Sequence, residues 1–332
     1  MRKAALAVAR ALCSTERVVL AAHVNPDGDT LGCTLALMHA LKALGKEVVV
    51  LSSDGVPCIY TWMPGADAVQ ISTERRDFDV AVVCDAGRID RIGSAQEAVL
   101  SAPLLVDVDH HLADGVFGNL LLVDADAAAA CELGWELVLA LEKVSGKRLA
   151  NRAIAECLLT GIITDTGSFQ FPSVTPRTFL IAAKLQRLGA APSRINELVF
   201  ENRSRESVEL LGRALSTLQI SPDGKVAWVH VTAQDYEELH AVDADTEGIV
   251  NHVRSIRGVL IGILFREIPG KKVRVSLRAR EGADVHRIAQ VFGGGGHRLA
   301  AGCSLSPPLE KAEELVVAEA IRQLKEQSAG EG

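Results

Sequence analysis

Short, almost continuously apolar runs recur along the first half of the chain. The runs occupy residues 17–23, 46–53, 78–86, 103–111 and 119–123. Runs of this length, rich in Val, Leu and Ala, are typical of strands that are buried on both faces. The pattern therefore predicts a parallel β-sheet.

Stretches with helical spacing separate these runs. Leu31, Leu35, Met38 and Leu41 recur at helical intervals after the first run, and Gly45 then favours a helix end, which predicts a β-α-β unit. Similar spacing favours a helix at the N-terminus. Further helices are expected at 128–145, 150–164 and 176–188. Residues 1–188 are thus expected to form a layered α/β domain.

The regular alternation of strand-like and helix-like segments ends after residue 188. Residues 189–218 are expected to be linker helices, one of them spanning 204–218, and residues 219–330 a smaller α+β domain. Its expected strands are 226–232, 258–266 and 273–279, and its expected helices are 284–292 and 309–326. The fold class is therefore α/β with two domains.

Composition narrows the protein class. A chain of 332 residues with 48% hydrophobic side chains is long enough to bury a core in each domain. The seven cysteines are scattered without a C-x-x-C pair, which favours a reducing cytoplasm over a disulfide framework or a zinc knuckle. No run approaches the roughly 18 apolar residues that a membrane span requires. We expect a cytoplasmic protein without membrane association.

Charge is distributed unevenly along the chain. The net charge is −7, yet residues 254–298 hold ten Lys or Arg and only three Asp or Glu. The overall acidity argues against nonspecific binding of duplex nucleic acid. An aromatic content of 4% argues against a long stacking track for single strands. The cationic segment is a candidate site for a smaller anion.

Acidic and histidine side chains follow three of the expected strands and one helix. They are His23, Asp27 and Asp29 after the first strand, Asp85 after the third, Asp109, His110 and His111 after the fourth, and Asp165 after the helix. Because parallel strands end at one edge of a sheet, where ligands bind in such folds, these side chains are expected to converge.

A cluster of carboxylates needs a counter-charge, because neighbouring anions raise one another's pKa. Carboxylates and imidazoles without thiolates suit Mn²⁺, Mg²⁺, Fe²⁺ or Co²⁺ better than structural Zn²⁺. Four aspartates balance two divalent ions, the arrangement of two-metal phosphoryl hydrolysis. We therefore expect two divalent metal ions.

Some of these acids also fit other roles. Asn25–Asp29 is also an ordinary turn sequence, but as a calcium loop it fails, because Thr30 and Ala36 occupy the positions that need Gly and Glu. Asp107 is left out of the site because it lies in the body of a strand. Asp124 and Asp126 are expected to cap a helix.

A glycine run marks the second domain. The stretch "FGGGGHRLAAG", residues 292–302, is flanked by apolar residues, unlike a flexible linker. Consecutive bare N–H groups form an anion-binding nest, and nearby cationic side chains add donors. The expected phosphate-binding residues are Gly293, Gly294, Gly295, Gly296, His297, Arg298 and Arg278.

Five motifs resemble, in their order along the chain, those of the DHH phosphoesterase superfamily with a glycine-rich C-terminal domain. They are "HVNPDGD", "VVCDAG", "VDVDHH", "TDTGSF" and "FGGGGHRLAAG". The resemblance implies a binuclear Mn²⁺ site in a cleft between the domains. It assigns His23, Asp27 and Asp85 to one ion, and Asp29, Asp85, His110 and Asp165 to the other. It also implies that His111 acts beside the scissile phosphate and that Asp109 orients the histidines.

The layout is most similar to compact oligoribonucleases that also dephosphorylate 3′-phosphoadenosine 5′-phosphate (pAp). The resemblance implies hydrolysis of very short RNA or linear dinucleotides to mononucleotides and removal of the 3′-phosphate of pAp. A nonhydrolysing nucleotide sensor and a cyclic-dinucleotide phosphodiesterase are the alternatives, and a homodimer is compatible with the sequence. One departure is Ala279, where many relatives carry serine.

Overall fold

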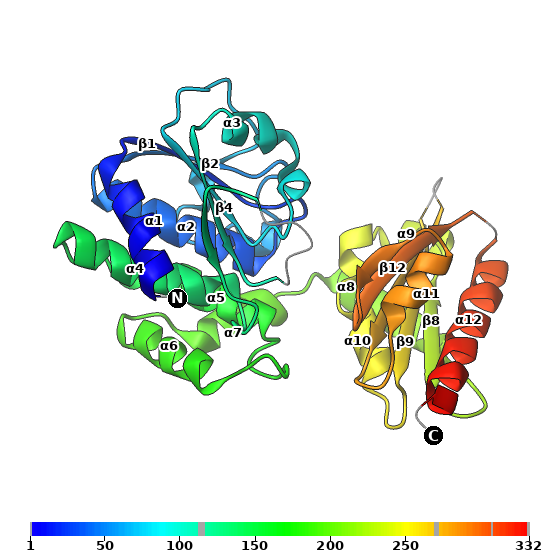
Figure 1. Cartoon of the computed structure of the whole chain (residues 1–332). Helices are drawn as coiled ribbons and strands as arrows, with labels where there is room; N and C mark the ends of the chain where they lie inside the picture. The colour runs from blue at the N-terminus through cyan, green and yellow to red at the C-terminus, as the bar shows by residue number, and fades with distance from the viewer. Residues whose placement is uncertain (1, 112–116, 269–271, 307, 331–332) are drawn as a thin grey trace. The chain divides into compact units, whose positions relative to one another are not determined.

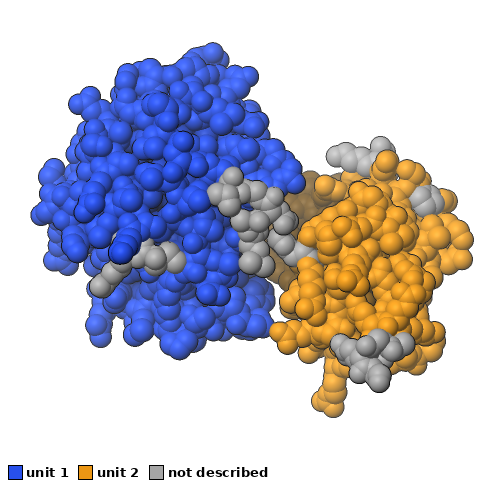
Figure 2. Space-filling model, in the orientation of Figure 1, with its two compact units in different colours: residues 1–202 blue, residues 203–332 orange. Residues whose placement is uncertain are grey.

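The chain folds into two compact units, residues 1–202 and residues 203–332 (Figure 2). The structure, a computed structural model, describes residues 2–111, 117–268, 272–306 and 308–330. Each unit contains its own β-sheet and its own buried apolar core. The prediction of a two-domain α/β chain is confirmed.

Unit 1 is built on a six-stranded sheet in which every pairing is parallel. Its strands, in spatial order, are β3 (Val69–Gln70), β2 (Glu47–Leu51), β1 (Arg17–Ala21), β4 (Val80–Cys84), β5 (Leu104–Asp109) and β6 (Leu120–Val123). Five of them were predicted, and the two-residue β3 was missed. The apolar runs formed parallel strands because both faces of the sheet are covered.

Two groups of helices cover this sheet (Figure 1). Apolar side chains of one face pack with α1 (Arg2–Ser14), α2 (Gly28–Ala43), α4 (Ala130–Ser145), α5 (Arg152–Asp165), α6 (Pro176–Arg187) and α7 (Pro192–Phe200) in the larger core. The other face packs against α3 (Gln96–Leu100) and the preceding 3₁₀ turn η3 (Ile89–Ala95). Shorter 3₁₀ turns are η1 (Cys58–Tyr60) and η2 (Ala66–Ala68).

Glycines let α2 and α5 pack closely. A Cβ on Gly32 would collide with the backbone carbonyl oxygen of Cys157 on α5. In return, a Cβ on Gly161 of α5 would lie 2.7 Å from a carboxylate oxygen of Asp29 on α2. This close packing brings the C-terminal end of α5 toward the N-terminal end of α2.

Unit 2 also contains a six-stranded sheet, in which only β8 and β9 pair in parallel. Its strands, in spatial order, are β11 (Gly295–His297), β12 (Ala300–Leu305), β10 (Val273–Ala279), β9 (Ile261–Glu267), β8 (Val226–Val231) and β7 (Gln219–Ile220). The predicted strand at 273–279 has the bounds found for β10.

Helices pack on both faces of this second sheet. One face packs with α8 (Arg205–Ser216), α9 (Ala233–Leu239) and α10 (Ile249–Arg254), and η4 (Asp243–Thr246) precedes α10. The other face packs with α11 (Val285–Val291) and α12 (Leu309–Gly330). Within the described ranges, no helix combines the length and the apolar character that crossing a bilayer demands.

Candidate active site

The candidate site forms where three neighbouring strands of unit 1 end. His23 lies two residues beyond β1, Asp85 directly follows β4, and His110 directly follows β5. These strands are adjacent in the order β1, β4, β5. Asp165, the last residue of α5, reaches the same place because α5 packs against α2. The structure therefore brings the predicted side chains together.

Three groups of side chains within the described residues have ligand atoms close enough to hold a metal ion. The groups are His23, Asp27 and Asp85; Asp29, His110 and Asp165; and Asp85, His110 and His111. Within each group the candidate atoms lie within 4.8 Å of one another. Asp85 belongs to two groups, so it can bridge two ions.

Backbone contact orients His23. Its Nδ1 lies 2.8 Å from the carbonyl oxygen of Val24. Because a carbonyl only accepts, Nδ1 donates, and Nε2 faces the carboxylates of Asp27 and Asp85 at 3.7 Å each. Burial acts to lower the pKa of His23, but the two carboxylates prevail and raise it to about 10. In the metal-free protein a proton therefore supplies the charge that an ion would bring.

His110 is held in the same way from another loop. Its Nδ1 donates to the carbonyl oxygen of Ala127 at 3.1 Å. Its Nε2 lies 3.4 Å from carboxylate oxygens of Asp85 and Asp165. Burial opposes protonation, yet these carboxylates and that of Asp29 raise the pKa of His110 to about 11. Both imidazoles thus present Nε2 to the acidic cluster.

Asp85 lies at the centre of the cluster and has an unusual backbone. Its φ of 58° is left-handed, a conformation that non-glycine residues adopt mainly at constrained sites. The side chain is buried, and its Oδ1 lies 3.4 Å from His110 Nε2 and 3.3 Å from His111 Nδ1 without a hydrogen bond of good geometry among the described residues. Burial acts to raise the pKa of Asp85, but the surrounding histidines hold it well below its usual value. This buried anionic oxygen is suited to a cation.

Asp29 is buried beneath the cluster. Its carboxylate accepts hydrogen bonds from the N–H groups of Ala130, at 2.5 Å, and Cys131, at 2.9 Å, at the start of α4. Burial and the charges of Asp85 and Asp165 hold the pKa of Asp29 well above its usual value.

The prediction that Asp124 and Asp126 cap a helix is wrong. The N-cap of α4 is Ala129, which has no side-chain hydrogen bond. Asp29, which is distant in sequence, takes the capping role because tertiary folding places its carboxylate at the helix N-terminus. Asp124 pairs instead with Arg177.

Asp165 completes the acidic set. Burial, together with the charges of Asp85 and Asp27, raises its pKa to about 7, although His110 acts in the opposite direction. The carboxylates of Asp29, Asp85 and Asp165 therefore resist simultaneous ionisation unless cations compensate their charge. The orphaned Asp85 oxygen and the donor set of oxygen and imidazole nitrogen both fit divalent metal ions.

His111 and Asp109 form a pair beside the cluster, and His111 Nδ1 also lies 3.3 Å from Asp85 Oδ1. Asp109 Oδ1 accepts from the backbone N–H of His111 at 2.9 Å and lies 2.7 Å from His111 Nδ1. Asp109 Oδ2 also accepts from the N–H of Gly87 at 2.5 Å. The carboxylates of Asp109 and Asp85 raise the pKa of His111 to about 9. His111 therefore carries a proton at neutral pH.

In unit 2, Arg278 on β10 is a partly buried cation. Its side chain donates a hydrogen bond of 3.1 Å to the neighbouring carbonyl oxygen of Leu277, and no carboxylate among the described residues pairs with it. Burial lowers its pKa. In the strand register Arg278 lies opposite Ala300, which in turn lies opposite His297. Arg298 follows and is exposed.

The second half of the glycine run belongs to a β-hairpin, because Gly295 and Gly296 lie on β11 and pair with β12. The expectation that all four N–H groups are bare is wrong for Gly293 and Gly294, which donate to carbonyl oxygens of α11 at 3.0 and 2.8 Å. Glycine is required at Gly294, where a Cβ would strike the carbonyl oxygen of Gly302.

Sequence reasoning missed the backbone groups of the site. The carbonyls of Val24 and Ala127 orient the two histidines, and the N–H groups of Ala130 and Cys131 bind Asp29. Every residue has such groups, so no residue type marks them. The glycines of α2 and α5 were a usable signal, because glycine inside a helix indicates close packing.

Comparison with known proteins agrees with this geometry. Residues 17–162 match the N-terminal domain of the DHH family, and residues 224–326 match the DHHA1 domain. The bifunctional oligoribonuclease and PAP phosphatase NrnA of Thermus thermophilus is 31% identical over 92% of this chain and 89% of its own length. The chain belongs to the DHH family. The predicted superfamily is confirmed, and with it a hydrolase of phosphoester bonds.

Two further relatives support this membership of the DHH family. The NrnA protein of Bacillus subtilis is 27% identical over 89% of this chain and 91% of its own length. A solved structure of an exopolyphosphatase-related protein from Bacteroides fragilis superposes with a TM-score of 0.92 at 25% identity and covers 99% of this chain and 98% of its own. The shared fold therefore extends over both units.

Proposed function

We propose that this protein hydrolyses very short oligoribonucleotides or linear dinucleotides to mononucleotides and removes the 3′-phosphate of pAp. The observation that carries the proposal is the convergence of two ligand groups, one of His23, Asp27 and Asp85 and one of Asp29, His110 and Asp165, with Asp85 Oδ1 3.4 Å from His110 Nε2. The relatives named as oligoribonuclease and PAP phosphatase match nearly the whole chain, which supports this choice of substrate.

We assign His23, Asp27 and Asp85 to one metal ion, and Asp29, Asp85, His110 and Asp165 to a second. Mn²⁺ fits this mixture of carboxylate and imidazole donors. When bound, two such ions supply Lewis-acid activation of water and of the phosphoryl oxygens. Without thiolates in the donor set, structural Zn²⁺ is a poorer fit.

His111 is assigned to proton donation. Asp109 Oδ1 lies 2.7 Å from Nδ1, so a proton for the leaving oxygen would come from Nε2. Because the carboxylates of Asp109 and Asp85 raise its pKa to about 9, His111 is protonated at neutral pH and is suited to donate to the leaving oxygen. Asp109 orients the ring and stabilises its charge.

Unit 2 is proposed to bind the phosphate or terminal nucleotide of the substrate. Arg278 has no carboxylate partner in the described part of the chain, and Arg298 is exposed, so both guanidinium groups are available to an anion. Gly295, Gly296 and His297 complete the proposed surface, and Gly293 and Gly294 shape it. The local excess of basic residues supports attraction of anionic substrates.

A nonhydrolysing sensor is less well supported. A protein that only binds a nucleotide does not require a complete ligand set, whereas here every proposed ligand takes part in a group with close donor atoms. The matched relatives, named as an oligoribonuclease and phosphatase, also favour hydrolysis.

The test is release of phosphate and mononucleotides from pAp, a linear diadenylate and a 24-nucleotide RNA, with Mn²⁺ or with a chelator. We expect cleavage of the short substrates in Mn²⁺ alone. Asp85→Asn should reduce hydrolysis of every substrate by at least about a hundredfold, because both proposed metal ions would lose an anionic ligand. Arg298→Ala should instead raise KM for nucleotides with little effect on a generic phosphodiester.

Two results would contradict the proposal. Full activity of Asp85→Asn would rule out the shared-ligand assignment. Tight binding of pAp without release of product, in Mn²⁺, would favour the sensor.

A further inference from the structure

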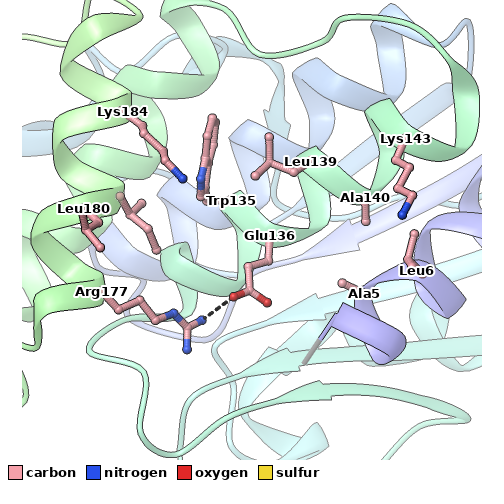
Figure 3. Close-up of a pocket in the computed structure, with 11 residues that line it drawn as sticks. Ala5, Leu6, Trp135, Glu136, Leu139, Ala140, Lys143, Arg177, Leu180 and Lys184 are labelled. Carbon is pink, nitrogen blue, oxygen red and sulfur yellow. Dashed lines mark ion pairs between the residues drawn. The ribbon is translucent and has the colours of Figure 1, made fainter.

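Arg177, on α6, lies among three carboxylates of unit 1. It approaches Asp124 at 2.6 Å, Glu132 at 3.0 Å and Glu136 at 3.2 Å. Figure 3 shows the ion pair between Arg177 and Glu136, which joins α6 to α4 beside a pocket of about 460 Å³. One guanidinium thus contacts three carboxylates from two different segments. The three contacts stabilise different parts of unit 1.

The contact with Glu132 stabilises the core. Glu132 is fully buried, and neither of its carboxylate oxygens has a hydrogen-bond partner among the described residues. Burial raises the pKa of Glu132, and the charge of Arg177 acts in the opposite direction. Arg177 supplies the compensating cation, so its removal would leave an uncompensated buried charge.

The contact with Asp124 connects Arg177 to a turn that contacts the candidate metal site. Asp124 begins a turn between β6 and α4, and its carboxylate accepts the N–H of Asp126 at 3.2 Å. Its backbone carbonyl accepts the N–H of Ala127 at 3.0 Å, and its own N–H donates to the carbonyl of Asp109 at 3.0 Å. These backbone bonds join the turn to β5, and the carboxylate of Asp124 joins the same turn to Arg177.

The same turn carries the carbonyl that orients a proposed ligand. Ala127 accepts the Nδ1–H of His110 at 3.1 Å, which directs Nε2 toward Asp85 and Asp165. Displacement of the turn would move this acceptor and loosen the imidazole. Partners behind a ligand commonly affect metal affinity through such orientation.

Among the described residues, the Glu136 carboxylate makes no hydrogen bond or ion pair with the metal cluster or with the turn that carries Ala127. Glu136 lies one helical turn beyond Glu132 on α4, lines the pocket and is about as accessible as Arg177. It therefore offers a matched comparison, since removing either Asp124 or Glu136 takes one carboxylate from the same guanidinium.

We infer that Asp124, anchored by Arg177, is a positioning residue that sets the orientation of His110 for metal binding. The inference rests on the proposed function, because it concerns the metal site proposed there. It predicts that loss of the Asp124 carboxylate weakens the metal site, and that loss of the Glu136 carboxylate does not.

The experiment compares Asp124→Ala with Glu136→Ala in the full chain. Mn²⁺ affinity is measured by the electron paramagnetic resonance signal of free Mn²⁺, and thermal unfolding is recorded in chelator. We expect Asp124→Ala to weaken Mn²⁺ binding about tenfold and Glu136→Ala to stay within about twofold of the wild type. Asp124→Asn, which keeps an acceptor for the Asp126 N–H but loses the oxygen that binds Arg177, should recover only part of the affinity.

Kinetics separate positioning from a general loss of structure. For Asp124→Ala we expect the Mn²⁺ concentration for half-maximal hydrolysis to rise by the same factor as the dissociation constant, while kcat at saturating Mn²⁺ stays within about threefold of the wild type. A lower unfolding temperature with unchanged Mn²⁺ affinity would show a purely structural role and overturn the inference.

The outcomes distinguish the two proposals. A wild type that binds no Mn²⁺ and hydrolyses nothing overturns the proposed function and the inference together. A wild type that binds Mn²⁺ and hydrolyses pAp, with equal affinity in Asp124→Ala and Glu136→Ala, overturns the inference alone. Arg177→Lys, which keeps a cation beside Glu132 but loses the guanidinium fork, should weaken Mn²⁺ binding in the same direction as Asp124→Ala.

Discussion

Asp107 is a buried acid without a matching cation. It lies on β5, two residues before Asp109, and its Oδ1 has no hydrogen-bond partner in the described ranges. Burial and the charge of Asp109 raise its pKa to about 7, although His111 acts in the opposite direction. It belongs to none of the three ligand groups found among the described residues. Its contribution to stability must therefore depend on pH.

The pH dependence of stability follows from the protonation of Asp107 in the folded and in the unfolded chain. Between the ordinary pKa of 3.8 and the raised value of about 7, the unfolded chain releases a proton that folded Asp107 retains. Stability therefore falls as pH rises through this window and is lowest, for this group, above pH 7. We expect Asp107→Asn to match the wild type near pH 4 and to be more stable by about 1–3 kcal/mol at pH 8, measured by urea unfolding in chelator.

The matched control for this prediction is Asp67→Asn, because Asp67 is exposed on η2. It should leave the free energy of unfolding within about 0.5 kcal/mol of the wild type at both values of pH. An Asp107→Asn protein that is no more stable than the wild type at pH 8 would show that the buried carboxylate is solvated or paired.

At the residue scale, the side chains of the site could be predicted and their backbone partners could not. Asp85 and His110 follow apolar runs directly, and the geometry of a parallel sheet brings such positions to one edge. The carbonyls of Val24 and Ala127 have no residue-specific signal. They act because the folded turns bring them to the imidazole rings.

At the scale of elements, the contact between α2 and α5 holds the two halves of the site together. Gly32 permits it, because a side chain there would strike the backbone of Cys157. A carbonyl in a helix cannot move aside as the end of a flexible side chain can. The α2 helix carries Asp29, and α5 ends at Asp165, so their spacing sets the spacing of two proposed ligands.

We expect Gly32→Ala to destabilise unit 1 by about 1–3 kcal/mol because it overpacks this contact. Mn²⁺ affinity should fall as well, since the helices that carry Asp29 and Asp165 must separate. Urea unfolding and Mn²⁺ titration check the two effects.

Gly212→Ala is the matched control for the helix contact. Gly212 lies on α8 with open space where a Cβ would be, so alanine there should be neutral or stabilising by up to about 1 kcal/mol. A Gly32→Ala protein as stable as the wild type would mean that the two helices can adjust without cost.

The helices and strands that were predicted well have a regular spacing of apolar residues. The errors arose mainly where contacts between distant parts of the chain determine the local structure. The α4 helix was expected to have a local acidic cap, but Asp29 supplies it from 101 residues away. The strand β3 is only two residues long, so it has no recognisable alternation. The glycine run formed a strand because its partner, β12, was available to pair with it.

At the scale of the whole molecule, the two units have separate cores, so their stabilities can respond to different ligands. All the proposed metal ligands lie in unit 1, and Arg278 and Arg298 lie in unit 2. A ligand that binds only the folded form of one unit stabilises that unit by mass action. Metal should therefore act on the unfolding transition of unit 1, and an anion bound by Arg278 and Arg298 on that of unit 2.

We expect calorimetry to show that Mn²⁺ raises the unfolding temperature of unit 1 and leaves that of unit 2 within about 2 °C. The shift should be larger at pH 8 than at pH 6. Carboxylates raise the pKa of His23 to about 10 and of His110 to about 11, so each ion must displace protons, which is easier as pH rises.

The chelator-treated protein is the control for this measurement. An equal shift of both transitions would mean that the units unfold together, and an Mn²⁺ shift that is larger at pH 6 would contradict the displacement of protons from the two histidines.

The four segments that form the metal cluster are far apart along the chain, at residues 23–29, 85, 109–111 and 165. A ribosome releases them in that order, and a domain of this kind folds as a unit once enough of it has emerged. The nascent chain can therefore hold only fragments of the donor set until the end of α5 is free. Metal acquisition is then a late step of biogenesis, and a chain truncated before residue 165 would be made without ever gaining the complete centre.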